Sequence, residues 1–486
     1  MPIPSAGPIP SAGPSRRALL VAGGAAVGAT VGASALGLAG PAVAGSGTAR
    51  HRPAARTGPV PGNPPTGSRV DFHRWTTFDD FRSGRGEGIE VIPGQRLGVV
   101  MSRPVGTVTY DDPYLNTSQT YEYSVWTSPV RRLQLHGNQL TAHWNAHTPD
   151  GTFLKVEMRA VMEDGHSDWW TMGIWAFADT SLRRTSVNGQ SSSYGEIDTD
   201  TWSAHGDHRM RAYQLRLTLY RLPGLTVSPR VWQIGAIASY VPDRTTVPAS
   251  PPGPATGITL PVTPYAQNIH AGQYPQYGGG GEAWCSPTST EMVSEYWGGK
   301  PNSSQLSWIN PSYADPTVDY AARYTYDWAY EGTGNWPFNT AYAASFGHSG
   351  ADAAWPRLDG MVSRLNSLWE LEVLVAAGFP VVTSQSFTKA EMGFYSSDGH
   401  LWVVMGFTSD GTGVIVNDPA SNSDGNVYTV YDRREFEIVW LRTVYTREDG
   451  SQGGGTGGIC YIIKPHDKAL PPVVDRHSPS WPGGQA

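Results

Sequence analysis

The sequence GGGGEAWCSPTSTEMV occupies residues 278–293 of the chain. It places a glycine run before Trp284 and Cys285 and then predicts the start of a helix, because Ser286 is a suitable N-cap and Pro287 suits the first helical turn. A thiol at a helix N-terminus lies near unpaired backbone N–H groups and the positive end of the helix dipole. Both favour the thiolate, which is the nucleophilic form of cysteine. This stretch therefore predicts that Cys285 is a reactive nucleophile.

The chain contains one other cysteine, Cys460, so a Cys285–Cys460 disulfide is the structural alternative. Cys460 lies in the apolar sequence GICYII at 458–463, which predicts a strand in which a buried free cysteine packs as a small hydrophobic residue. A secreted scaffold that depends on disulfides usually has more cysteines than two. We therefore expect a free, reactive Cys285.

A cysteine nucleophile needs a base, and imidazole is the usual group because it titrates near neutral pH. His400 directly precedes an unbroken apolar run at 401–407, which predicts a buried strand that fixes the ring. The turn sequence SDGT at 409–412 joins this run to a second one at 413–417, so the two predict a hairpin. Asp418 closes the second strand at the open end of the hairpin, near His400. It is the predicted partner that orients the imidazole.

An attacked carbonyl develops a negative oxygen, which needs hydrogen-bond donors. The backbone N–H of Cys285 is one predicted donor. A side-chain amide from the segment ahead of the glycine run is the second, and Gln267, Gln273 and Gln276 are all available. Gln267 is preferred because it follows PYA at 264–266, which predicts the end of a strand that would hold it firmly. The choice among the three stays open at this point.

Five motifs, in this order, resemble the C-thirty-nine-like cysteine peptidases, a branch of the papain-like fold related to the proteases that trim bacteriocin leader peptides. The motifs are PYAQ at 264–267, WCSPTS at 284–289, GFPVV at 378–382, GHLWVV at 399–404 and VNDP at 416–419. The resemblance covers roughly residues 260–465. It implies Cys285 as nucleophile, His400 as base and acid, Asp418 as orienting residue and Gln267 as oxyanion donor. It implies no metal and no organic cofactor, and Ser286 departs from the glycine that often follows the family's cysteine.

The length of 486 residues predicts two folded domains with unstructured ends. Short alternating segments at 68–243 predict an all-β, jelly-roll-like sandwich as an accessory domain. A proline-rich linker follows at 244–259. Residues 260–466 then predict an α+β domain, papain-like by the resemblance, in which the apolar spacing of 358–377 predicts a helical pair. The Pro/Gly-rich residues 467–486 predict a disordered tail.

The predicted sandwich contains no convincing catalytic set. Glu196, Asp198 and Asp200 alternate along GEIDTDT at 195–201, so a cation site on one strand face is one interpretation, but a solvated strand edge explains them better. Four tryptophans fit a carbohydrate or peptide surface and core packing equally well. They are Trp169, Trp170, Trp175 and Trp202.

Residues 1–44 are typical of a twin-arginine signal peptide. SRRALL at 15–20 precedes a weakly apolar Gly/Ala/Val stretch, and Ala42 and Ala44 fit a small-x-small cleavage site. A retained membrane anchor is the weaker alternative, because glycine and alanine give little transfer energy into lipid. We therefore expect a secreted, extracellular bacterial protein with no stable membrane insertion after cleavage, and a disordered segment at 45–67.

The formal net charge of −7 and the pI of about 6.0 give no sign of nucleic-acid binding or of an anionic membrane partner. The expected partner is a peptide or protein substrate, cell-wall peptide included. Two alternatives remain open from the sequence. One is a peptidoglycan amidase or endopeptidase with the same three residues, and the other is a non-catalytic extracellular protein that binds glycan or peptide.

Overall fold

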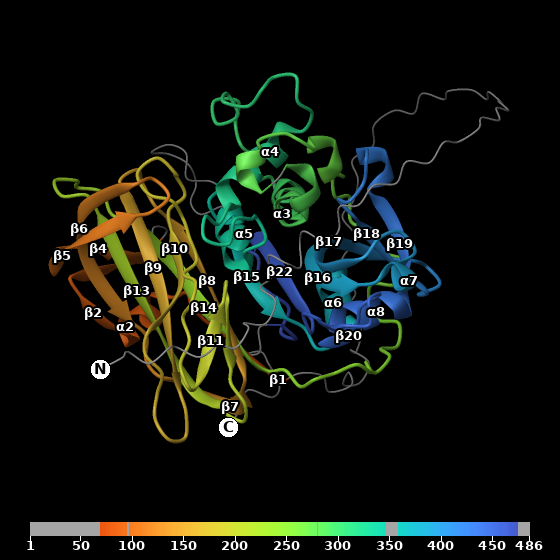
Figure 1. Cartoon of the computed structure of the whole chain (residues 1–486), viewed down its shortest axis with the longest axis horizontal. Helices are drawn as coiled ribbons and strands as arrows, with labels where there is room; N and C mark the ends of the chain where they lie inside the picture. The colour runs from red at the N-terminus through yellow and green to blue at the C-terminus, as the bar shows by residue number, and fades with distance from the viewer. Residues whose placement is uncertain (1–68, 95–96, 279, 347–357, 475–486) are drawn as a thin grey trace, which may run out of the picture.

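The computed structural model describes residues 69–94, 97–278, 280–346 and 358–474 (Figure 1). The predicted signal peptide at 1–44, the predicted disordered segment at 45–67 and the end of the predicted tail, 475–486, lie outside the described residues. None of the helices in the described ranges is long and apolar enough to cross a membrane.

Within the described residues, the first part of the chain forms two antiparallel seven-stranded sheets. The first sheet contains β1 (Arg69–Trp75), β3 (Ile89–Ile92), β4 (Gly98–Met101), β8 (Gln139–His147), β11 (Gly195–Asp198), β12 (Thr201–Ala204) and β14 (Arg230–Tyr240). The second sheet contains β2 (Arg85–Glu87), β5 (Gly106–Asp112), β6 (Thr117–Thr127), β7 (Arg131–Gly137), β9 (Thr152–Val161), β10 (Trp170–Trp175) and β13 (Met210–Arg221). The short helix α2 (Phe78–Ser83) begins at a Thr77 capping box.

Aromatic side chains from the two sheets contact each other. Trp75 of β1 lies 6.0 Å from Trp126 of β6, and Trp170 of β10 lies 6.3 Å from Trp202 of β12, measured between ring centroids. Trp170 and Trp202 are buried, as is Trp175, so three of the four tryptophans in question form core. Burial of such large rings contributes much of the hydrophobic stabilisation of this part.

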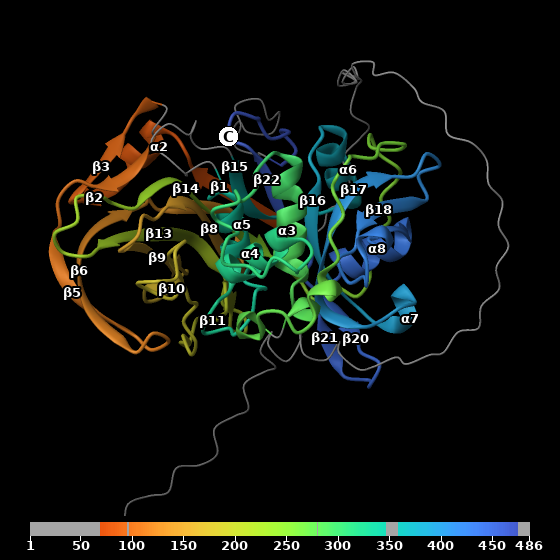
Figure 2. The same ribbon diagram turned by 90° about the horizontal axis from the view of Figure 1, so that it is seen from above.

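The second part of the chain places helices on a six-stranded antiparallel sheet of order β15-β22-β16-β17-β18-β19. Its strands are β15 (Leu358–Arg364), β16 (Val381–Phe387), β17 (Ser397–Phe407), β18 (Gly413–Asn417), β19 (Tyr428–Asp432) and β22 (Ile459–Pro465), with a separate pair, β20 (Val444–Thr446) and β21 (Gln452–Gly454). Its helices are α3 (Cys285–Tyr296), α4 (Pro316–Thr325), α5 (Trp336–Ala343), α6 (Leu368–Ala376), α7 (Lys389–Met392) and α8 (Arg433–Leu441). Figure 2 shows α3 on the face of the sheet toward the first part, and α8 on the opposite face.

The predicted helical pair at 358–377 is wrong in its first half, because residues 358–364 form strand β15. All seven residues of this strand are buried, so the sequence lacks the alternation that marks a half-exposed strand. Gly360 lets the strand pass close to α5, since a Cβ atom there would lie 2.1 Å from the carbonyl oxygen of Thr340. The second half does form a helix, α6, which Ser367 caps through the backbone N–H of Glu370.

The proline-rich segment at 244–259 is not a free spacer. Val247 and Ala255 are buried against the second part, where the backbone N–H of Ser250 donates to Glu437 over 2.9 Å. The predicted tail also begins later than residue 467, because Leu470 and Val474 are buried. Composition alone predicted the first segment as a linker and the second as a disordered tail, and the apolar side chains scattered among the prolines explain why both pack.

The outer edge of β15 is covered by the first part of the chain. The side chain of Asn145, on β8, donates to the carbonyl oxygen of Gly360 over 2.6 Å and accepts from the N–H of Gly360 over 3.2 Å. Trp232 of β14 donates to Asp359 over 3.1 Å. Buried apolar residues form one continuous cluster through both parts, and Trp144 contacts Phe338 at 6.1 Å between centroids. The two parts therefore share a core at this boundary.

Candidate active site

Helix α3 begins at Cys285, with Trp284 as its N-cap and no side chain capping its N–H groups. The prediction of Ser286 as N-cap is therefore wrong. Its hydroxyl instead lies 2.9 Å from the hydroxyl of Tyr461 on β22, and both residues are buried. Cys285 is the first helical residue, where backbone N–H groups lack partners within the helix and the helix dipole is positive.

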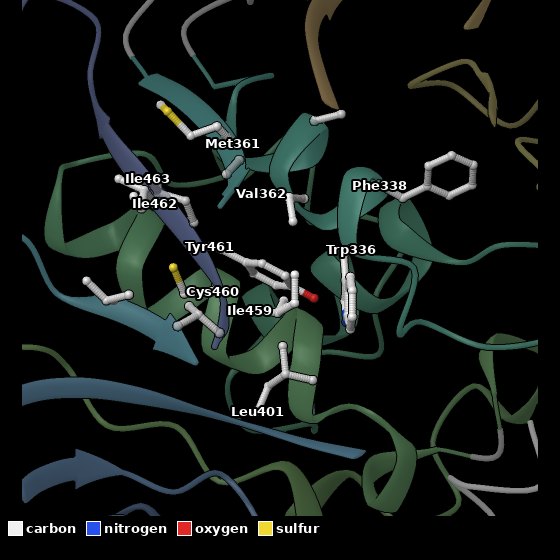
Figure 3. Packing of buried hydrophobic residues seen from close by; sticks show 14 of the residues in the cluster. Trp336, Phe338, Met361, Val362, Leu401, Ile459, Cys460, Tyr461, Ile462 and Ile463 are labelled. Atoms are coloured by element: carbon white, nitrogen blue, oxygen red, sulfur yellow. The ribbon is translucent and has the colours of Figure 1, made fainter. Parts of the chain in front are cut away.

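The two cysteines are free thiols in different environments, which rules out the disulfide alternative. Cys285 is 3% exposed, whereas Cys460 is fully buried on β22 and burial raises the pKa of its thiol. Figure 3 shows Cys460 and Tyr461 projecting from opposite sides of this strand, with the Tyr461 hydroxyl toward Trp336. A thiol with a raised pKa is a poor nucleophile, so Cys460 is a packing residue.

His400 and Asp418 meet at the end of the β17–β18 pair. Nε2 of His400 lies 2.8 Å from Oδ1 of Asp418, and both side chains are buried. Asp418 accepts three further hydrogen bonds: from the hydroxyls of Tyr431 over 2.7 Å and Tyr395 over 3.1 Å, and from the N–H of Ala420 over 2.9 Å. These donors hold a buried carboxylate in its charged form, which would otherwise be costly.

The charge on this pair explains the protonation of the imidazole. Burial lowers the pKa of His400, but the charge and hydrogen bond of Asp418, followed by a hydrogen bond and charge interaction with Cys285, raise it to about 10. Burial also disfavours the charged form of Asp418 and so raises its pKa. The charge and hydrogen bond of His400 and the hydrogen bond of the Tyr431 hydroxyl outweigh this effect, so the pKa of Asp418 lies below its usual value. Because Nε2 is engaged by Asp418, Nδ1 is the nitrogen that remains for Cys285. His400 is therefore a cation at neutral pH, next to the thiol.

Aromatic rings enclose the imidazole on several sides. Tyr395 lies 5.5 Å from the His400 ring and Trp402 lies 5.8 Å from it, both edge-on, and Phe387 lies 6.2 Å away. Trp402 stacks on Tyr431 at 4.4 Å. These rings exclude water from the imidazole and strengthen its interaction with Asp418, because electrostatic interactions grow as the local dielectric constant falls.

Sequence reasoning missed Tyr395 and Tyr431 as partners of Asp418. Tyr431 lies on β19, directly beside the strand that leads into Asp418, with Val414 as its register partner. Pairing of β19 with β18 puts Tyr428 opposite Asn417 and Tyr431 opposite Val414, so the register alone does not single out Tyr431 as a partner of Asp418. Tyr395 lies in a segment between α7 and β17 that carries no periodic pattern, so nothing in the sequence pointed to it.

Replacing Tyr431 with phenylalanine should lower the free energy of unfolding by about 1–3 kcal/mol, since a hydrogen bond to a buried charge is lost. Denaturant unfolding would measure this loss. Tyr428→Phe on the same strand is the matched control, because Tyr428 is 53% exposed and should leave stability unchanged. Equal effects of the two substitutions would contradict the role given to the Tyr431 hydroxyl.

Gln267 lies next to the turn that precedes Cys285. Its side-chain amide donates to the carbonyl oxygen of Glu282 over 2.8 Å, and its backbone N–H donates to Pro419, directly after Asp418. Gly281 permits this approach, because a Cβ atom there would lie 2.3 Å from the carbonyl oxygen of Gln267. The amide has a second N–H, and the described residues offer no recorded acceptor for it.

The other two glutamines lie in different surroundings. Oε1 of Gln273 accepts from Nδ1 of His270 over 3.0 Å, and Gln276 is exposed. Neither forms a recorded hydrogen bond with the turn before Cys285 among the described residues. Of the three candidates, Gln267 is therefore the one whose side chain is bonded to the turn before Cys285.

Cys285 lines a cavity of about 220 Å³ between the two parts of the chain. The second part also contributes Trp336, Arg364, Asp398 and Leu401 to its wall. The first part contributes four residues of the first sheet, namely Gln139, Asp198, Thr201 and Ser203. The thiol is therefore accessible to a ligand from a space that both parts enclose.

The acidic residues at 196–200 do not form a cation site. Asp200 is fully buried and its Oδ2 accepts the backbone N–H of Trp336 over 2.8 Å, whereas Glu196 is exposed. Across the described ranges, no group of three or more His, Cys, Asp or Glu side chains is arranged to hold a metal ion. Asp198 remains as a carboxylate in the wall of the cavity.

Comparisons with known proteins find one family match in each part of the chain. Residues 71–239 match the family described as Peptidase C39 N-terminal domain, and residues 259–448 match the Peptidase_C39 like family. No curated protein matches the sequence. A crystal structure from Bacillus anthracis, described as that of a C39-like peptidase, is 17% identical and covers 43% of this chain and 97% of that chain, with a TM-score of 0.22.

Proposed function

We propose that this protein is a cysteine peptidase with Cys285, His400 and Asp418 as its catalytic triad, because residues 259–448 match the C39-like peptidase family. The observation that carries the proposal is the hydrogen-bonded pair of His400 and Asp418 beside a thiol at a helix start. An oriented, protonated imidazole next to such a thiol stabilises the thiolate that attacks a carbonyl carbon.

The proposed reaction hydrolyses a peptide bond in two stages. The Cys285 thiolate attacks the carbonyl carbon, and the resulting oxyanion accepts hydrogen bonds from the Cys285 N–H and the Gln267 amide. His400 gives its proton to the leaving amine as the C–N bond breaks, which leaves a thioester on Cys285. Neutral His400 then takes a proton from water, whose oxygen attacks the thioester, and the acid and the thiolate are released.

We also propose the finer architecture and setting. The packing of α3 against β17 supports a papain-like layout for the second part, and the contacts between the two sheets support a jelly-roll-like sandwich for the first. The sequence SRRALL at 15–20 supports export by the twin-arginine route and therefore a secreted protein. Its partner would be a peptide or protein substrate outside the cell.

Iodoacetamide at neutral pH tests the reactivity on which the proposal depends. We expect mass spectrometry to find Cys285 modified and Cys460 unmodified in the folded protein, because the thiolate is the reacting form. Both cysteines should be modified in denaturant, which is the control for reagent and detection. A Cys285 that is inert in the folded protein would reject the peptidase and favour a non-catalytic binding protein.

A further inference from the structure

The first part of the chain reaches the candidate active site through the hairpin β11–β12 and the start of β8. Thr199 at the tip of the hairpin has a φ of 56°, a left-handed conformation that is uncommon for a residue with a branched side chain. Asp200 ties this tip to the start of α5 through the N–H of Trp336, over 2.8 Å. Trp336 lines the cavity that contains Cys285. The tip is therefore fixed in a tight conformation against the cavity wall.

Asp198 stands at this tip with little to balance its charge. It is half-buried, lines the cavity, and accepts one recorded side-chain hydrogen bond, from the hydroxyl of Thr199 over 3.2 Å. No Lys, Arg or His side chain forms a recorded ion pair with it within the described ranges. A partly desolvated carboxylate without a cationic partner favours a bound cation.

The two other charged side chains in the cavity wall, Asp398 and Arg364, already have hydrogen-bond partners within the protein. Asp398 accepts from Nε of Arg447 over 2.6 Å and from the hydroxyl of Tyr445. Arg364 is 3% exposed and donates to Gln139 over 2.9 Å, as well as to backbone carbonyl oxygens. The acceptors of Arg364 are neutral oxygens, so Asp198 is the carboxylate in this wall that a cationic group of a ligand would compensate.

We propose that Asp198 binds a positively charged group of the substrate, an ammonium or a guanidinium, and so selects the peptides that reach Cys285. This inference rests on the proposed peptidase function. It assigns a substrate-recognition role to the first part of the chain, through a residue outside the catalytic domain. Because the hairpin is anchored to α5, the carboxylate is held in place before the substrate arrives, which lowers the entropy cost of binding.

Paired peptides that differ in one charge test this role. In each pair a lysine replaces norleucine at one position, scanned along both sides of the cleaved bond, and a second set compares free with acetylated N-termini. The lysine scan reports a side-chain cation and the second set a terminal amine. We expect wild-type protein to prefer the cationic peptide of at least one pair by about tenfold or more in kcat/KM.

Asp198→Asn should bring that preference to within about twofold, because kcat/KM for the cationic peptide falls toward that of its uncharged partner. The matched control is Glu196→Gln, an equal change of charge two residues away on the same face of β11, at an exposed residue outside the cavity wall, which should retain the preference. A wild type without any charge preference, or an Asp198→Asn variant that keeps it, would overturn the inference.

Binding separates this inference from the proposed function. Calorimetry with the Cys285→Ala variant measures affinity for the same peptide pairs without turnover, and the added Asp198→Asn change should remove the difference within a pair. If Cys285→Ala still hydrolyses peptides as fast as wild type, the proposed function fails. The affinities then decide the role of Asp198 independently. Tighter binding of the cationic peptide by Cys285→Ala, lost when Asp198→Asn is added, supports this role, and equal affinities of Cys285→Ala for the two peptides of every pair reject it.

Discussion

Replacing Cys285 with alanine should abolish peptide hydrolysis, with a loss in kcat/KM on the order of 10⁵-fold or more. The physical reason is that no other described side chain stands at a helix start beside a protonated imidazole. A peptide library incubated with wild type and variant, with products identified by mass spectrometry, measures the loss and also reports the cleavage preference.

Cys460→Ala is the matched control for this substitution. This substitution removes the other free thiol, which lies on β22 next to Tyr461, the residue that bonds to Ser286. It therefore changes the core and leaves the proposed nucleophile in place. We expect a small loss of stability, about 1 kcal/mol, from the small cavity it creates, and unchanged turnover. Activity that survives Cys285→Ala but not Cys460→Ala would reverse the roles given to the two cysteines.

Asp418→Asn should lower kcat/KM by about 10²- to 10⁴-fold, because the imidazole loses the carboxylate that orients it and stabilises its charge. The pH profile is the more specific measurement. Wild-type kcat/KM should fall as pH rises through about 10, where His400 loses the proton that the leaving amine requires. The variant's alkaline limb should lie at lower pH, since the main cause that raises the pKa of His400 has been removed. Identical alkaline limbs for wild type and variant would contradict the pairing of His400 with Asp418.

The same substitution makes a prediction for stability. A histidine whose pKa is raised by folding, here from 6.5 to about 10, contributes stability that is complete below pH 6.5 and is lost as pH rises through about 10. Urea unfolding should therefore show that wild type and Asp418→Asn differ widely in free energy of unfolding near pH 6, and that this difference narrows toward pH 10. If the difference in free energy of unfolding stayed constant over this range, His400 would not be the group that causes it.

The sequence predicted the features of the site that depend on local order along the chain. The hairpin that leads from His400 to Asp418 follows from two apolar runs and a turn, and β17 and β18 form it. The helix after the glycine run follows from the residues around Cys285, although it begins two residues earlier than a Ser286 N-cap would place it. Helix starts and hairpins are short-range, so residue types and spacing carry them.

The features that the sequence could not supply come from pairing between distant segments. Leu358 and its neighbours become a strand because β22, about a hundred residues later, pairs with them. The donors Tyr395 and Tyr431 reach Asp418 through the sheet, and Asp198 reaches the cavity from the first part of the chain. The family match at 71–239 lies in this first part, where the motifs of the second part gave no guidance.

The contact between Asn145 and Gly360 has a consequence for how the molecule can be divided. β15 is the last strand of its sheet, and an uncovered terminal strand presents free N–H and C=O groups that recruit strands from other molecules. A single amide side chain from the first part satisfies both backbone groups of Gly360. The first part of the chain thus covers this edge at Gly360, and separating the two parts would expose it.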